Sequence, residues 1–140
     1  MSHRQWWLVT YYLLFAAFLM AAALNMLHMR LGFFTTDLAD VVVPAWLYIA
    51  WRGLVSPGGR TTLIQRTLGR TPAIAAVSLF IASTITEISQ RFWPHGVFSG
   101  RFDPLDVLAF AGGLLACYAA DTRWSGAPRD PVAAAPRPAA

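Results

Sequence analysis

The chain has 140 residues, of which 56% are hydrophobic and only 13% are charged. That charged share is about half of the ~25% usual for soluble domains, and a water-soluble fold of this size could not bury so much apolar surface. All eleven basic residues are Arg, and they lie scattered between apolar blocks, so the formal net charge of +4 does not indicate nucleic-acid binding. The single Cys117 lies in an apolar run, which excludes a disulfide framework.

Four stretches of the chain are apolar over about the ~20 residues that a membrane-spanning helix needs. The first carries no charge, and the second contains Pro44, which membrane helices tolerate. We therefore expect an all-α membrane protein whose single domain, residues 1–124, has four transmembrane helices. The predicted spans are 6–27, 37–55, 71–90 and 104–120.

The two ends of the chain need separate interpretations. Ala21 and Ala23 form a small-residue pair after an apolar stretch, as in a signal peptide. The apolar run is longer than a normal signal-peptide core and the residues before it are barely basic, which favours a retained helix. Residues 125–140 are mostly Ala, Pro and Arg without periodicity, and this composition predicts a disordered tail.

The Arg residues predict the orientation. Eight of the eleven fall in the N-terminus, the second loop and the tail, and three fall on the other side, so both termini are predicted to be cytoplasmic. Four of the six Trp residues also fall at the predicted inner boundary: Trp6, Trp7, Trp51 and Trp124. The second loop, 56–70, is predicted to form a short surface helix with Leu63, Ile64 and Leu68 on one side.

Polar residues recur at helical spacing at the predicted outer ends of three helices. Asp37 and Asp40 begin the second helix. The third carries Ser83, Glu87, Gln90 and Arg91 as a stripe, and the fourth carries Asp103, Asp106, Phe110 and Gly113. Polar groups inside a bilayer are costly, so their placement indicates function by default. The alternative is that they are interfacial anchors, which we favour for Asp37, Arg30 and Arg91 but not for Glu87, Gln90 and Asp106.

The short loop between the third and fourth helices predicts one polar cluster that contains Glu87, Gln90, Arg101 and Asp106. Glu87 lies roughly one turn, or about 5 Å, below the end of its helix. A lone carboxylate at that depth is expected to pair with Arg or to share a proton.

Other chemistries find little support in the sequence. His28 and His95 have no partner at metal-ligand spacing, so no metal site is predicted, and no cofactor either. No nucleophile motif or phosphate-binding loop occurs. Enzyme activity is left open and is not favoured.

Small residues recur every four positions in the fourth span. Ala109, Gly113 and Cys117 form one line, and Gly112, Ala116 and Ala120 form another. Both lines let helix backbones approach closely. We expect packing within the monomer rather than a dimer seam.

The segment from the third helix into the fourth resembles the VanZ-like family of small bacterial membrane proteins. TEISQ (86–90) and GRFDPLDVLAFAGG (100–113) carry the family's E-x-x-Q pair, loop Arg, D-x-x-D and Gly at Glu87, Gln90, Arg101, Asp103, Asp106 and Gly113. Phe110 replaces the family's Asn, and a related uncharacterised family, the DUF2809 type, has Tyr there. The resemblance implies a multi-pass protein of the bacterial cytoplasmic membrane with a link to glycopeptide resistance.

From these features we expect a protein that binds an amphiphilic envelope component, such as a lipid-linked precursor or a lipophilic glycopeptide, at the outer leaflet. The predicted binding residues are Glu87, Gln90, Arg91, Arg101, Asp103 and Asp106, with the two Arg residues engaging anionic head groups. Two alternatives remain open. One is an accessory or assembly subunit of a larger membrane complex, and the other is a lipid head-group enzyme that uses carboxylate acid–base chemistry.

Overall fold

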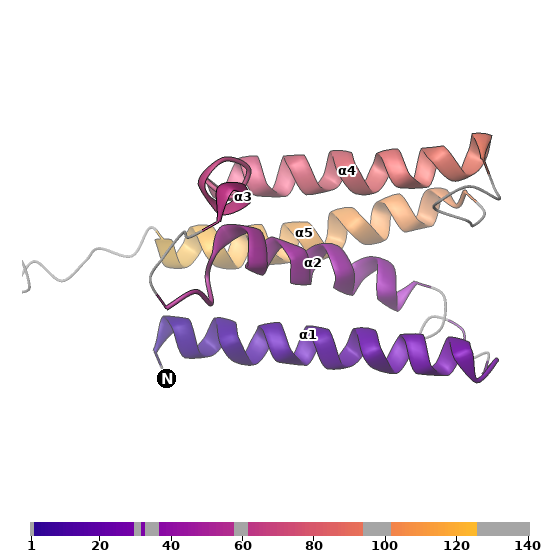
Figure 1. Ribbon diagram of the computed structural model, residues 1–140, viewed down its shortest axis with the longest axis horizontal. Helices are drawn as coiled ribbons and strands as arrows, with labels where there is room; N and C mark the ends of the chain where they lie inside the picture. The colour runs from indigo at the N-terminus through magenta and orange to yellow at the C-terminus, as the bar shows by residue number, and fades with distance from the viewer. Residues whose placement is uncertain (1, 30–31, 33–36, 58–61, 94–101, 126–140) are drawn as a thin grey trace, which may run out of the picture.

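The computed structural model describes residues 2–29, 32, 37–57, 62–93 and 102–125. These residues form helices and turns without a strand, which confirms the predicted all-α class. Long helices lie side by side and alternate in direction, and short α3 lies at the end of the bundle where α4 begins (Figure 1). The helices are α1 (His3–Met26), α2 (Leu38–Arg52), α3 (Leu63–Arg66), α4 (Pro72–Phe92) and α5 (Pro104–Ser125).

Among the described residues, three helices are long and apolar enough to cross a membrane: α1, α4 and α5. Helix α2 has 15 residues and is therefore only about 22 Å long, against a hydrocarbon core of about 30 Å. It ends before the predicted limit at residue 55 because Gly53 adopts a left-handed conformation, with φ of 67°. The structure thus supports a membrane protein with three candidate spans, and the predicted second span, residues 37–55, stays a prediction.

Local features of the sequence explain where α1, α4 and α5 begin. The Ser2 hydroxyl accepts a hydrogen bond from the Gln5 backbone N–H, and the Gln5 side-chain oxygen accepts one from the Ser2 backbone N–H. The Thr71 hydroxyl accepts from the Ile74 backbone at 3.1 Å in the same way. Helix α5 starts at Pro104. Proline suits the first helical position because a backbone N–H at that position would have no acceptor within the helix.

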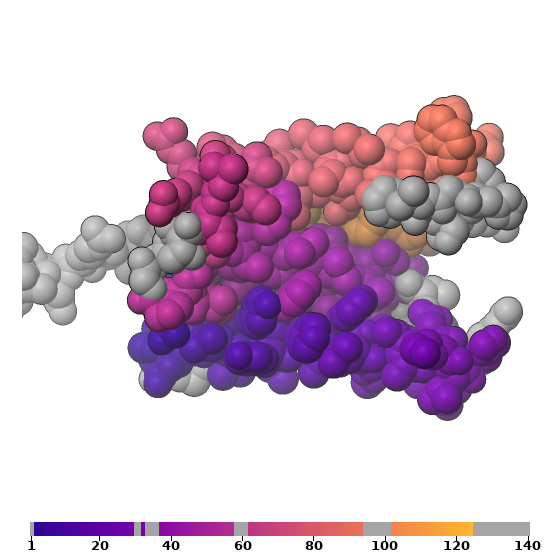
Figure 2. All heavy atoms as spheres, viewed as in Figure 1, coloured from indigo at the N-terminus to yellow at the C-terminus, as the bar shows by residue number. Residues whose placement is uncertain are grey.

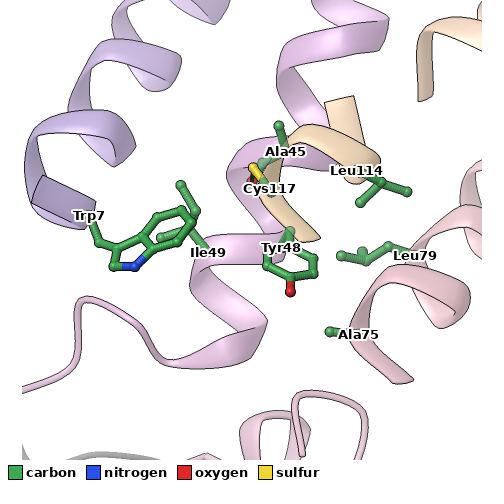
Figure 3. Packing of buried hydrophobic residues seen from close by; sticks show 8 residues of the cluster. All are labelled: Trp7, Ala45, Tyr48, Ile49, Ala75, Leu79, Leu114 and Cys117. Atoms are coloured by element: carbon green, nitrogen blue, oxygen red, sulfur yellow. Dashed lines mark hydrogen bonds between the residues drawn. The ribbon is translucent and has the colours of Figure 1, made fainter. Parts of the chain in front are cut away.

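Helix α2 is the centre of the bundle. It packs against α1, α4 and α5, and on the face shown in Figure 2 its atoms lie between those of α1 and α4. The core fills the half of the bundle near the start of α1, where Trp7 reaches from α1 toward Ile49 of α2 (Figure 3). Its buried members are Trp7, Ala45, Tyr48, Ile49, Ala75, Leu79, Leu114 and Cys117.

The outer surfaces of the long helices are strongly apolar. Tyr12, Leu13, Ile85, Leu108 and Leu115 are each more than 60% exposed. Monomeric soluble proteins rarely expose apolar surface on this scale. Such a surface suits contact with lipid hydrocarbon, in agreement with the membrane class predicted from composition.

Candidate functional site

A cavity of about 210 Å³ lies between α2, α4 and α5, in the half of the bundle opposite the apolar core. It is close to the ends where α2 and α5 begin and α4 finishes. We call it the α2–α4–α5 cavity. Its lining residues are Ala39, Asp40, Val43, Pro44, Ser83, Thr86, Glu87, Gln90 and Phe110.

Glu87 is the most deeply buried polar residue of this cavity, with 3% of its surface exposed. Its Oε1 accepts a hydrogen bond of 2.7 Å from the backbone N–H of Asp103, so the carboxylate joins the end of α4 to the start of α5. Because Ser83 and Gln90 lie four residues before and three after it, all three share one side of α4. Glu87 is thus buried within the bundle and bonded to the start of α5, whereas the predicted cluster that also contains Arg101 and Asp106 stays a prediction. The binding role of Glu87 stays a prediction as well.

Carboxylates from three helices gather at this end of the bundle. Asp40 lies within electrostatic range of Glu87 and Asp106, and Asp106 is likewise close to Glu87 and Asp103. Asp40 and Glu87 line the cavity, whereas Asp106 is half-buried beside it. In a medium of low dielectric constant, grouped carboxylates strongly favour a hydrogen-bond donor or a positively charged group among them.

Pro44 leaves one backbone acceptor of α2 without its usual donor close to the cavity. Proline has no backbone N–H, so the Asp40 carbonyl four residues earlier lacks its usual helical donor. Both residues line the cavity. On the opposite wall the Thr86 hydroxyl donates to the Ser83 carbonyl at 2.6 Å, which leaves its oxygen lone pairs for other partners. The two carboxylates of Asp40 and Glu87 make the cavity rich in acceptors, and the arrangement is suited to a ligand rich in donors.

The structure does not bring all of the predicted site residues together. Gln90 lines the cavity with Glu87, but Arg91 is exposed at the end of α4 and does not line it. The side chain of Asp103 is exposed and accepts from the Leu105 N–H at 2.9 Å, so it caps α5. Arg101 lies outside the described residues, as do Arg30, His95 and the tail beyond Ser125.

No group of three His, Cys, Asp or Glu side chains in the described part of the chain is placed to hold a metal ion. His28 follows α1 in a left-handed conformation, with φ of 56°, and its ring nitrogen contacts the Met26 carbonyl at 3.0 Å.

Asp40 is one of the acids predicted at the helix ends but is not among the predicted site residues, although it lines the cavity. Its signal was Pro44, four residues later, because that spacing puts both residues on one side of α2 and frees the Asp40 carbonyl. The hydroxyls of Ser83 and Thr86 gave a weaker signal, since both residue types are common in membrane helices.

A second polar group, at the opposite end of the bundle, was missed entirely. Asp121 is fully buried, and its Oδ2 accepts from the Tyr48 hydroxyl at 2.8 Å and from Arg52 Nε at 2.6 Å. Arg52 also donates to the Gly69 carbonyl at 2.8 Å. The sequence signal for this group was Asp121 itself, an acid at the predicted cytoplasmic end of the fourth apolar span. A buried acid requires a partner. This group joins α2, α5 and the segment before α4, and we interpret it as structural.

Comparisons with protein families, with curated proteins and with solved structures find no match to the chain. The resemblance of the segment from Thr86 to Asp121 to the VanZ-like family thus stays a hypothesis that rests on the motif residues themselves. What the structure adds is a membrane-type helical fold and an acceptor-rich cavity beside part of that motif.

Proposed function

We propose that this chain is a VanZ-like, four-span protein of the bacterial cytoplasmic membrane that binds the polar head of an amphiphilic envelope component in the α2–α4–α5 cavity. The observation that carries the proposal is Glu87, a carboxylate that is almost completely buried and yet lines an open cavity. Burying a charge is costly, and intramembrane ionisable residues are for that reason most often functional.

The cavity lining favours a head group with several hydrogen-bond donors. Hydroxyl, amide or amine groups match the carboxylates of Asp40 and Glu87 and the Asp40 carbonyl. An anionic head group fits less well, because Arg91 lies away from the cavity. Sugar or peptide portions of a lipid-linked precursor or of a lipophilic glycopeptide have the required donors. The volume of about 210 Å³ is below the ~300–1,000 Å³ of typical ligand pockets, so only part of the head enters.

The hydrocarbon part of such a ligand has a matching surface on the same helices. An apolar groove of about 240 Å³ runs between α4 and α5, lined by Ala76, Val77, Phe80, Ala111, Leu114 and Leu115. Phe80 lies three residues before Ser83 of the cavity, so about one helical turn separates the two sites along α4. An acyl or polyprenyl chain in this groove would remain in contact with lipid.

Changing Glu87 to Gln is expected to weaken ligand binding roughly ten- to a hundredfold, because a hydrogen bond to a charged group contributes about 1.5–3 kcal/mol. Glutamine keeps the oxygen that accepts from Asp103 N–H, so the fold should be retained. The measurement is the affinity of protein in lipid nanodiscs for a lipophilic glycopeptide and for a polyprenyl-linked disaccharide.

The matched control is Asp103→Asn, which removes a nearby carboxylate that does not line the cavity and leaves a side chain able to cap α5. We expect this variant to bind as the unmodified protein does. Equal affinity of the Glu87→Gln protein and the control for both ligands would refute the binding role.

The proposed orientation gives a second prediction. In a Cys117→Ala background, a cysteine at Ser99 should react with a membrane-impermeant maleimide in intact cells, and a cysteine at Gly59 should react only after permeabilisation. The reason is the excess of Arg on the side that holds Gly59. The reverse labelling pattern would place the cavity on the cytoplasmic side.

A role as an accessory or assembly subunit is the second candidate, and one observation favours it. Gly113 packs against the Val41 backbone inside the bundle, whereas Gly112 is exposed, with no atom within 4 Å of a Cβ built on it. Ala116, one turn further, is exposed as well. This part of α5 would let another membrane helix approach closely. Native purification distinguishes the candidates, since a stoichiometric membrane partner supports the accessory role and bound lipid supports the binding role.

A further inference from the structure

Short helix α3 has the reverse of the side-chain arrangement expected in water. Its one buried side chain is the polar Gln65, with 9% exposed. Leu63 and Ile64 are 76% and 46% exposed, and Leu68 in the following turn is 39% exposed. A surface helix of a soluble protein turns its apolar side to the core. Here the apolar side chains point outward, which indicates that their surroundings are apolar.

Polar contacts hold α3 in this orientation. Gln65 Nε2 donates to the Ala50 carbonyl at 3.1 Å and to the Ser56 hydroxyl at 3.3 Å. The Arg52 guanidinium binds the Gly69 carbonyl, and a Cβ at Gly69 would overlap the backbone of Trp51. The segment is thus fixed to the end of α2 from both of its ends. It cannot turn its leucines inward without breaking these bonds.

The level of α3 along the bundle matches a membrane–water interface. It lies at the end where α1 begins and α5 finishes (Figure 1). The rings of Trp6, Trp7 and Trp124 contact one another at that end, with centroids 4.3–5.9 Å apart. Trp side chains concentrate at the level of lipid head groups. Arg66 and Arg70, which lie on either side of Leu68 in the sequence, are themselves exposed.

We propose that α3 and the turn after it dock on an anionic phospholipid leaflet, with Leu63, Ile64 and Leu68 among the upper acyl carbons and Arg66 and Arg70 at the phosphates. We call these five residues the α3 patch. Anionic lipid is the fitting partner because the patch combines apolar side chains with two positive charges and has no acidic residue. Exposed apolar and basic residues on one short helix are typical of interfacial membrane segments.

The test measures which lipid surrounds the patch. The Cys117→Ala, Leu63→Cys protein is labelled with an environment-sensitive fluorophore and reconstituted into vesicles of phosphatidylcholine and phosphatidylglycerol. Spin-labelled lipid near the head group should quench the label more strongly than lipid spin-labelled deep in the acyl chain. Phosphatidylglycerol should quench more than phosphatidylcholine with the same spin label, and Arg66→Gln with Arg70→Gln should reduce this preference by up to about fivefold per arginine.

A label at Leu115, in the middle of the exposed side of α5, is the matched control and should respond most to the deep spin label, with no change in the double Arg variant. That control also shows that the variant remains folded in the membrane. Two results would overturn the proposal. In the first, aqueous iodide quenches the Leu63 label; in the second, neither iodide nor spin-labelled lipid quenches it. The first result means water contact and the second means coverage by a second copy. Equal quenching by the two lipids would overturn the preference for anionic lipid.

Discussion

Changing Asp121 to Ala is expected to lower the free energy of unfolding by about 3–5 kcal/mol. Asp121 is fully buried and forms an ion pair with Arg52, whose side chain is 6% exposed. Without Asp121, the buried guanidinium would keep the cost of leaving water but lose its counter-ion. The contacts of Arg52 with the Gly69 and Arg70 carbonyls would not replace the lost charge. Reversible unfolding in mixed detergent micelles, followed by Trp fluorescence, measures the change.

The matched variant is Tyr48→Phe, which removes one hydrogen bond to Asp121 and leaves the ion pair in place. We expect it to cost about 1.5–3 kcal/mol, the usual contribution of a hydrogen bond to a charged group. Asp121→Asn should fall between the two, because it keeps an acceptor and removes the charge. Equal stability of Asp121→Ala and Tyr48→Phe would show that the pair is hydrated in the protein, contrary to its burial.

The long helices were predictable from sequence because their signal is strong. Apolar stretches of about twenty residues define the predicted spans 6–27, 71–90 and 104–120, and the structure has α1, α4 and α5 there. The ends differ by several residues, as in α5, which continues to Ser125. Hydropathy marks apolar length, whereas caps and local hydrogen bonds decide where a helix ends.

The second helix shows the limit of that signal. Residues 37–55 are apolar enough for a span, but Gly53 ends α2 at Arg52. Its central place between α1, α4 and α5 was not visible in the sequence, because the order of neighbours in a helix bundle depends on packing between distant residues. Small residues gave a partial signal. Cys117 and Gly113 pack on α2, as expected for packing within the monomer.

The polar sites were predictable to different degrees. The stripe of Ser83, Glu87 and Gln90 was readable because helical spacing alone puts those residues on one side of α4. The contribution of Asp40 to the cavity could not be predicted from spacing alone, since it depends on how α2 lies against α4 and α5. Asp121 was missed for the same reason. Its partners Tyr48 and Arg52 are 73 and 69 residues away in the sequence.

Changing Gly113 to Ala is expected to destabilise the bundle by about 3 kcal/mol, because a Cβ at this position would overlap the Val41 carbonyl of α2. The obstacle is backbone in the centre of the bundle, and the Ala45 Cβ lies 3.5 Å from the same position, so neither neighbour can move aside easily. Two helices would have to separate to admit one methyl group, and α2 would lose contacts with α5 along its length. Unfolding in mixed micelles measures the loss.

The adjacent Gly112 offers the sharpest control, since the same substitution there adds the same methyl group to the same helix. No atom lies within 4 Å of a Cβ at Gly112, so Gly112→Ala should leave stability unchanged or raise it by up to about 1 kcal/mol through helix propensity. A difference between the two variants of less than about 1 kcal/mol would contradict the close approach of α2 and α5. That approach places Asp40 of α2 near Asp106 of α5, so the Gly113→Ala protein should also lose affinity for a cavity ligand, whereas the Gly112→Ala protein should keep it.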